Sequence, residues 1–282
     1  MKKILLPTDF SAASINAIEY AVQLFRNEDC NFYVLNTYEP VALYTSTTYG
    51  NDPGLDLEIG ELFKKKSKEQ VQKVIDEVSA KYRDEHHVFK GISTFNMLSI
   101  EVNELVNDYD LDLIIMGTNG ASGLKEVFIG SQTMHVIKNA KVPVIGVPQG
   151  YSYKQPKDIL FTTDYKTNEH HTGMYLLENI CNKNISRLIF LNAYDGNSLT
   201  SQQVANMESL NAFFKRDAHL TQIVKGMDVL DAMDDFQSRH GIDLLVLVHN
   251  KHNFFENLLF KPVVKKVVHH ASVPFLILPT QN

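Results

Sequence analysis

Residues 3–10 read Lys-Ile-Leu-Leu-Pro-Thr-Asp-Phe, and residues 158–165 read Asp-Ile-Leu-Phe-Thr-Thr-Asp-Tyr. Each stretch is a short apolar run that ends in Thr-Asp, and the two aspartates, Asp9 and Asp164, are 155 positions apart. Self-similarity of this kind has to be recognised before any motif, because a missed repeat leads to the wrong fold for the whole chain. The match predicts two related domains in one chain.

The repeat extends beyond these two stretches. Three further pairs of segments resemble each other: 32–38 and 188–194, 112–116 and 243–247, and 142–148 and 273–279. The offset falls to 131 in the last pair, mainly because a Tyr-, Thr-, Gly- and Pro-rich loop at 40–60 has a shorter counterpart near 195–201. Polar residues 149–157, interrupted by a glycine and a proline, mark the best boundary. The predicted domains are therefore residues 1–149 and 150–282.

Both halves alternate short runs of Ile, Leu and Val with segments whose apolar residues recur at helical spacing, such as 98–109 and 263–271. The short runs are continuously apolar, which is typical of parallel strands covered by helices on both faces. The predicted fold class is α/β, with two tandem doubly wound domains that each contain a five-stranded parallel sheet. Such sheets bind ligands at the carboxyl ends of the strands, near the topological switch point.

Length and composition exclude several classes of protein. With 282 residues, 44% of them hydrophobic, the chain is neither a disulfide-stapled miniprotein nor disordered. A net charge of -6 argues against a nucleic-acid binder that relies on bulk positive charge. Two cysteines are too few for a secreted disulfide framework, and no signal peptide or membrane-spanning apolar run is evident. We expect a cytoplasmic protein.

Residues 116–131 read Met-Gly-Thr-Asn-Gly-Ala-Ser-Gly-Leu-Lys-Glu-Val-Phe-Ile-Gly-Ser and lie between an apolar run and a helical pattern. Glycines allow positive φ and a close approach to phosphate, and the N-terminus of the following helix favours an anion. The segment contains neither the Walker pattern GxxxxGK[ST] nor the Rossmann pattern GxGxxG. It predicts a phosphate site of a different nucleotide-binding family.

The spacing Gly-x2-Gly-x9-Gly-Ser in this segment resembles the ATP-binding signature of the universal stress protein family. Residues 6–11 (Leu-Pro-Thr-Asp-Phe-Ser), 35–37 (Leu-Asn-Thr) and 142–144 (Val-Pro-Val) are also similar to that family. The resemblance therefore covers the first half, and the repeat extends it to the second. It implies a tandem member whose α/β domains bind adenine nucleotides or are degenerate relatives of such domains.

The resemblance also implies a set of site residues. It places Asp9 and its two preceding neighbours near adenine and ribose, the Thr37 backbone at the adenine edge, and the glycines with Ser131 around ribose and phosphates. The chain departs from the family at 119 and 132, where members often carry His and Val. The implied contacts to ATP, which can carry magnesium, are Pro7, Thr8, Asp9, Thr37, Met116, Gly117, Asn119, Gly120, Gly130, Ser131, Gln132 and Thr133.

Two structural explanations compete with these assignments. The glycines suit a turn that needs them for packing alone, and Asp9 suits a charge at a helix N-terminus beside a Ser11 cap.

The second half has lost the signature. Its residues at the four signature positions are Val248, Lys251, Lys261 and Pro262. Val248 is β-branched where positive φ is expected, and Pro262 removes an N–H and a hydroxyl. Asp164 is retained opposite Asp9, so we expect the strand-end architecture to survive without phosphate chemistry. The chain is predicted to bind one ATP, in its first half.

Three functions are compatible with these features. The leading hypothesis is a non-enzymatic, nucleotide-responsive regulator with an unknown protein partner, since no motif names a catalytic base. The second is a scaffold that binds an apolar ligand or protein through the apolar cluster at 254–260, although burial of that cluster between the domains is favoured. The third is a slow ATP hydrolase. The histidine pairs lack metal-ligand spacing, so no protein-bound metal is expected.

The last strand of each half is also informative. Residues 142–147 and 273–278 are apolar and end their domains, so each would leave an exposed sheet edge. In the resembled family, domains associate through this strand. We therefore expect the two strands to pair within one chain as a pseudo-symmetric dimer, and the association of two chains stays open.

Overall fold

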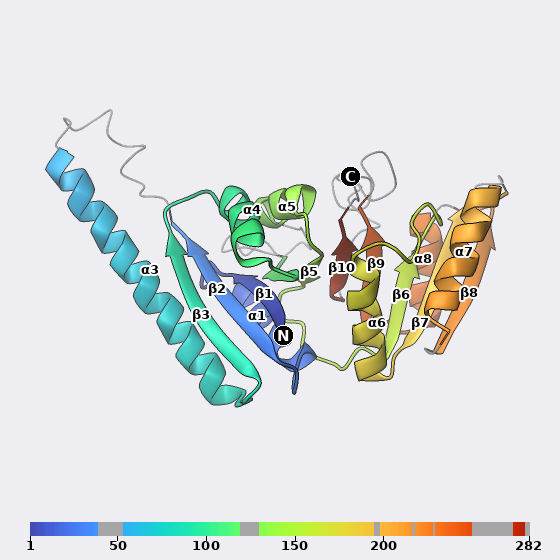
Figure 1. Ribbon diagram of the computed structural model, residues 1–282, viewed down its shortest axis with the longest axis horizontal. Helices are drawn as coiled ribbons and strands as arrows, with labels where there is room; N and C mark the ends of the chain where they lie inside the picture. Colours follow the sequence, from blue (N-terminus) through green and yellow to red (C-terminus); the bar gives the residue numbers. More distant parts are fainter. Residues whose placement is uncertain are drawn as a thin grey trace.

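A computed structural model gives the fold of the chain (Figure 1). It describes residues 1–38, 53–118, 130–194, 198–215, 218–227, 229–249 and 273–279. The first half contains β1 (Lys2–Pro7), α1 (Ala12–Leu24), β2 (Cys30–Thr37), α3 (Pro53–Lys81), β3 (His87–Thr94), α4 (Leu98–Tyr109), β4 (Leu113–Gly117), α5 (Ser131–Asn139) and β5 (Val144–Val147). The second half contains β6 (Asp158–Thr162), α6 (Gly173–Asn184), β7 (Arg187–Tyr194), α7 (Ser201–Phe213), β8 (Ala218–Lys225), α8 (Val229–Arg239), β9 (Leu244–Val248) and β10 (Phe275–Leu278).

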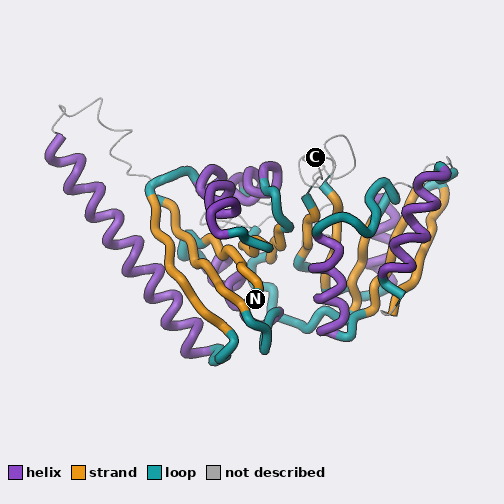
Figure 2. Tube along the Cα trace, viewed as in Figure 1, coloured by secondary structure: helices purple, strands orange, loops and turns teal. Residues whose placement is uncertain are grey.

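The strands form one ten-stranded sheet in the order β3-β2-β1-β4-β5-β10-β9-β6-β7-β8. Within each half all neighbouring strands are parallel, and β5 pairs with β10 in the antiparallel direction. Helices cover both faces of the sheet, and Figure 2 shows the two halves on either side of the central strand pair. The predicted fold class and the predicted pairing of the last strands are both confirmed.

The continuous apolar runs of the strands reflect burial on both faces of the sheet. Ile4, Leu5 and Leu6 of β1 are all fully buried, and their side chains alternate between two hydrophobic clusters. A strand with one solvated face would instead alternate polar with apolar residues. Among the described residues, none of the helices has the length and apolarity needed to cross a membrane.

The predicted helix over 98–109 is confirmed as α4, which buries Val102 and Leu105. The residue after it, Asp110, has a left-handed backbone conformation. Such a conformation commonly ends a helix. The apolar stripe predicted at 263–271 lies outside the described residues.

The structure corrects the loop predicted at 40–60. Residues 53–60 form the first turns of α3, while 39–52 lie outside the described residues. Two glycines and a proline led to the wrong prediction here. Pro53 is the first residue of the helix, and proline is favoured at that position because the first N–H groups of a helix have no intrahelical acceptor.

The connection between the halves is packed against the first half. The rings of Tyr151 and Tyr153 lie edge-on to the buried ring of Tyr20 in α1, with centroids 6.1 and 5.5 Å apart. Asn16 of α1 donates a hydrogen bond to the carbonyl oxygen of Pro148 at 3.2 Å. The boundary predicted between residues 149 and 150 falls in this connection and stays a prediction.

The packing of the connection can be tested with Tyr153→Ala. We expect it to lower the free energy of unfolding by about 1–3 kcal/mol, because it removes a half-buried ring and an aromatic pair. Urea denaturation of the full chain measures this loss. Lys154→Ala, an exposed neighbour, should change stability by less than about 0.5 kcal/mol. Equal effects of the two substitutions would contradict a structural role for the connection.

Candidate functional site

A cavity of about 390 Å³ lies at the carboxyl ends of β1, β2 and β4. The strand order reverses between β1 and β4, so the cavity occupies the topological switch point of the first half. Its lining residues are Pro7, Thr8, Asp9, Ser14, Asn36, Thr37, Asn96, Leu98, Met116, Gly117, Gly130, Ser131, Gln132 and Thr133. They come from the strand ends, the first turn of α1, the start of α4 and the N-terminus of α5.

The segment from β1 to α1 forms a hydrogen-bonded turn. Thr8 Oγ1 accepts from the backbone N–H of Phe10 at 3.0 Å and is 2.9 Å from Ser14 Oγ. Asp9 Oδ1 accepts from the backbone N–H of Ser11 at 3.0 Å, and Ser11 caps α1. The turn holds Asp9 at the cavity while its carboxylate also serves as a charge at the helix N-terminus. Asp9 is therefore both a charge at the N-terminus of α1, as the structural explanation proposed, and a residue of the cavity wall.

Burial and hydrogen bonding act on Asp9 in opposite directions. Desolvation raises the pKa of the carboxyl group, but hydrogen bonds from Ser11 and Ser14 lower it more, so the pKa lies below its ordinary value of 3.8. Asp9 is the only charged residue among the described residues that line the cavity. The side chain is therefore an ionised hydrogen-bond acceptor at neutral pH.

Gly117 is required for packing and not for positive φ. A Cβ at this position would lie 2.7 Å from the carbonyl oxygen of Ala13 and 3.1 Å from the backbone nitrogen of Ser14. Among the described glycines, positive φ occurs at Gly150 and Gly226, whereas Gly130 has a φ of -57°. The prediction of positive φ at the signature glycines is therefore wrong for the two that the structure describes, and the packing explanation holds for Gly117.

The two ends of the glycine-rich segment are fixed by backbone hydrogen bonds. Gly130 N–H donates to the carbonyl oxygen of Thr118 at 2.5 Å, and Thr118 N–H donates to Val147 of β5 at 3.1 Å. Thr133 Oγ1 donates to the carbonyl oxygen of Gly117 at 2.9 Å. These bonds direct the N-terminus of α5 at the cavity. Its first N–H groups have no acceptor within the helix, and Gly130 has no side chain to cap them.

The structure brings together most of the predicted site residues. Ten of the twelve line the cavity, while Asn119 and Gly120 lie outside the described residues. Sequence reasoning missed Ser14, Asn36, Asn96 and Leu98. For Asn36 a signal was available, because the repeat carries Asn192 at the corresponding strand end.

The missed asparagines have structural hydrogen bonds. Asn36 donates to the carbonyl oxygen of Thr8 at 2.7 Å and accepts from Ser67 of α3 at 2.6 Å. Asn96 donates to Glu101 of α4 at 2.9 Å. Both side chains therefore fix the loops that form the cavity wall.

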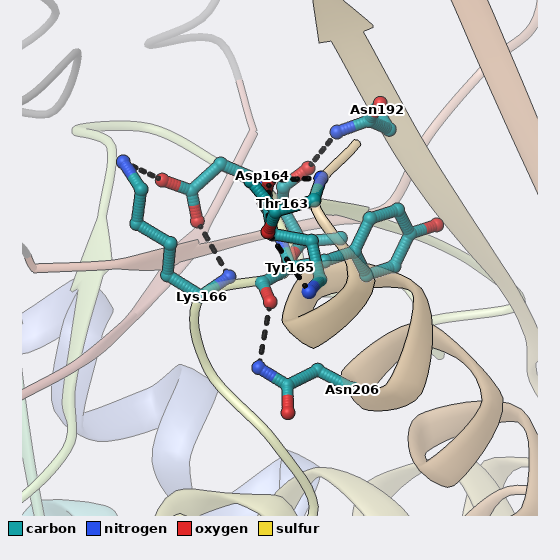
Figure 3. A network of polar contacts seen from close by, with 8 residues as sticks. Thr163, Asp164, Tyr165, Lys166, Asn192 and Asn206 are labelled. Carbon is teal, nitrogen blue, oxygen red and sulfur yellow. Dashed lines mark hydrogen bonds and ion pairs between the residues drawn. The ribbon is translucent and has the colours of Figure 1, made fainter. Parts of the chain in front are cut away.

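The second half repeats the strand-end turn (Figure 3). Tyr165 N–H donates to Thr163 Oγ1 at 2.9 Å, and Asn192 donates to the carbonyl oxygen of Thr163 at 2.8 Å. These bonds correspond to those of Phe10, Thr8 and Asn36, and Phe10 and Tyr165 share a positive φ. The predicted survival of the strand-end architecture is confirmed.

The surroundings of this second turn differ. Lys166 stands at the position that corresponds to Ser11 in the first half, and its ammonium lies 3.0 Å from the Asp164 carboxylate. Asn206 and Gln203 of α7 donate to the carbonyl oxygens of Tyr165 and Asp164 at 2.8 and 2.6 Å. The second turn is thus bound by α7, whereas the first is bound by α1 through Ser14. The signature counterparts Lys251, Lys261 and Pro262, and the apolar cluster at 254–260, lie outside the described residues.

The fold and the cavity define a class: two tandem α/β domains, the first of which has a cavity at its topological switch point. A family model described as "Universal stress protein family" matches residues 1–148 and 185–279. The chain belongs to the universal stress protein family.

Individual relatives agree with this assignment. The chain is 31% identical to universal stress protein MJ0531 of Methanocaldococcus jannaschii over 159 residues, which cover 55% of this chain and 84% of that protein. It is 29% identical to MJ0577 of the same organism, over 52% of this chain and 94% of that protein. The crystal structure of a universal stress protein from Archaeoglobus fulgidus DSM 4304 has a similar fold, with a TM-score of 0.64, 17% identity and coverage of 99% and 97% of the two chains.

Gly117→Ala tests the close approach of β4 to α1. The added methyl would meet backbone atoms, so we expect a loss of about 1–3 kcal/mol in the free energy of unfolding. Gly241→Ala is the matched control, since a Cβ there meets nothing within 4 Å and its φ is not positive. Denaturation in urea compares the two. Similar small effects would show that Gly117 is not a packing requirement.

Asp9→Asn tests the charge of the turn. A carboxyl group whose pKa is lowered on folding stabilises the folded state above its unfolded pKa, and this contribution is lost as the pH falls through the folded value. The stability difference between the parent and Asp9→Asn should therefore shrink as the pH falls below about 4. Unfolding measured between about pH 6 and pH 2 gives this difference, and a constant difference would contradict the lowered pKa.

Proposed function

We propose that the protein is an ATP-binding regulator that holds one nucleotide in its first half. The observation that carries this proposal is the cavity at the switch point, where the described signature residues Gly117, Gly130 and Ser131 meet at the N-terminus of α5. An open helix N-terminus beside a strand end suits a phosphate group, because its N–H groups point at the anion and the helix dipole favours negative charge.

The lining residues suit the parts of an adenine nucleotide. The ionised Asp9 carboxylate at the end of β1 suits the ribose hydroxyls, which are hydrogen-bond donors. The Ser131 hydroxyl and the first N–H groups of α5 suit the phosphates. The described lining offers no cation to offset the charge of a triphosphate. Magnesium bound to the nucleotide would supply positive charge there.

A regulator fits the described lining better than an enzyme does. A general base works best when its pKa lies near the operating pH. The pKa of Asp9 is lowered, and its Oδ1 is already engaged with the backbone of Ser11, so Asp9 is a poor base at neutral pH. ATP would then act by occupying the site, with a partner protein sensing the occupied state. Multiple turnover of ATP faster than about 1 s⁻¹ would contradict this role and favour a hydrolase.

A calorimetric titration of the nucleotide-stripped chain with ATP and magnesium tests the site. We expect about one ATP per chain. Ser131→Ala and Asp9→Ala should each weaken the affinity about tenfold or more, because each removes a hydrogen bond that involves a charged group. Asp164→Ala is the matched control at the equivalent turn of the second half and should leave the affinity unchanged.

Other outcomes of this titration discriminate between the hypotheses. Two ATP per chain, or equal losses in Asp9→Ala and Asp164→Ala, would place a nucleotide in both halves. No binding at millimolar ATP would leave a scaffold whose ligand binds elsewhere, and the apolar residues 254–260 would then be the first segment to mutate. Parallel titrations with ADP, AMP and cAMP measure which adenine nucleotide the site prefers.

A further inference from the structure

The two halves meet at the antiparallel pair of β5 and β10. In its register Phe275 faces Gly146, Leu276 faces Ile145, and Ile277 faces Val144. All five side chains, and the glycine opposite Phe275, belong to the centre of the ten-stranded sheet, where they are buried. This pair is therefore the surface through which each half recognises its partner.

Phe275 occupies the space that a side chain at Gly146 would need. A Cβ at Gly146 would lie 2.3, 2.5 and 2.9 Å from three atoms of the Phe275 ring. Real Cβ atoms essentially never come within 3.0 Å of another heavy atom. The ring therefore lies directly over the glycine, and any larger residue at 146 would displace it. The largest and the smallest residue of the two strands are matched across the joint.

The internal repeat shows that a match of a large residue with a glycine occurs on only one side of the strand pair. With the offset of 131, Val144 corresponds to Phe275, Ile145 to Leu276, and Gly146 to Ile277. The strand pair thus has a pseudo-twofold centre at Ile145 and Leu276. On one side of the centre Phe275 faces Gly146, and on the other Ile277 faces Val144. One side therefore pairs a large side chain with a glycine, and the other pairs two aliphatic side chains, although the two strands are related by the repeat.

Pairing of β5 with a second β5, or of β10 with a second β10, would lose this complementarity of side-chain size. Two copies of β5 in the same register would place Val144 against Gly146 twice, leaving the volume of the Phe275 ring unfilled. Two copies of β10 would place Phe275 against Ile277 twice, where the ring needs the space of a glycine. Both underpacking and overpacking destabilise a buried interface.

We propose that Phe275 and Gly146 form a size-matched pair that makes β5 select β10, and so directs each half of the chain to the other half and not to its own counterpart in a second copy. The partner that this surface fits is a β10 strand with an aromatic residue at its start. In a single chain that strand is always present, so the joint closes intramolecularly. This selectivity is independent of nucleotide binding.

Engineered cysteines at the pseudo-twofold centre report which strands pair. Opposed residues of antiparallel strands have Cα atoms about 4.5–5.5 Å apart, within the range for a disulfide. Ile145→Cys with Leu276→Cys forms an intrachain disulfide when β5 pairs with β10. Ile145→Cys alone can form only an interchain disulfide, when two β5 strands pair. Cys30 and Cys181 are as buried as positions 145 and 276, so both are replaced by alanine in every variant and the engineered thiols are the only ones left to oxidise.

In the parent background we expect the double-cysteine chain to give mainly the intrachain product on a non-reducing gel, and Ile145→Cys alone to give little dimer. Adding Gly146→Val should cause a several-fold loss of the intrachain product and a rise of the 145–145 dimer. The size swap Gly146→Phe with Phe275→Gly should restore the intrachain product at least in part. Val144→Ile, at the other opposed pair, is the control and should leave the products unchanged.

Phe275→Val keeps the test decisive if Gly146→Val fails to fold, because it removes the ring without creating a clash. It should also shift the products toward the 145–145 dimer, in a chain that still unfolds cooperatively. An unchanged intrachain fraction in folded Gly146→Val or Phe275→Val would overturn the proposal. The proposal would also be overturned if the size swap gave no more intrachain product than Gly146→Val does. The two positions would then tolerate no substitution, but their matched sizes would not select the partner strand.

Discussion

The first-half site depends on how closely the end of β4 approaches the first turn of α1. At Gly117 the two backbones leave no room for a Cβ, and the residues on both sides of this contact line the cavity. Ser14 comes from α1, while Met116 and Gly117 come from β4. The contact also fixes the turn that carries Asp9, because Thr8 is bonded to Ser14. A single absent side chain thus brings together the acidic residue and the glycine-rich segment.

In the second half that close approach is blocked. Val248 stands where Gly117 stands, so a helix placed like α1 would collide with its side chain. The repeat offset of 155 puts the counterpart of the α1 start at residue 167, but α6 begins at Gly173. The intervening residues take an irregular path, and α7 binds the strand-end turn through Asn206. The turn is kept as a structural unit while the contact that shapes a ligand cavity is replaced.

The sequence predicted the sheet, because continuous apolar runs and an internal repeat can be read directly from the residues. The resemblance to a family supplied the predicted site residues, and ten of them line the cavity. The sequence left two explanations open for Gly117, positive φ and packing, and could not choose between them, since a close contact with α1 depends on tertiary packing that no local pattern contains. Asn96 lines the cavity and is held by a hydrogen bond to Glu101. No sequence motif marks this pair, so it could not be predicted. The start of α3 was missed because its glycines resemble a loop locally, and the contacts of this helix with β3 are made further along, where Val71 and Ile75 lie over Gly91. Figure 1 shows the first turns of α3 beyond the end of β3.

The cavity of the first half lies close to the second half. Gly146 of β5 lies in register with Met116 of β4 on one side and with Phe275 of β10 on the other. Met116 lines the cavity, and Thr118, at the base of the glycine-rich segment, is bonded to Val147 of the same strand. One short strand therefore separates the cavity from the second half. Gly146 therefore lies between a residue of the cavity wall and the Phe275 ring of the second half.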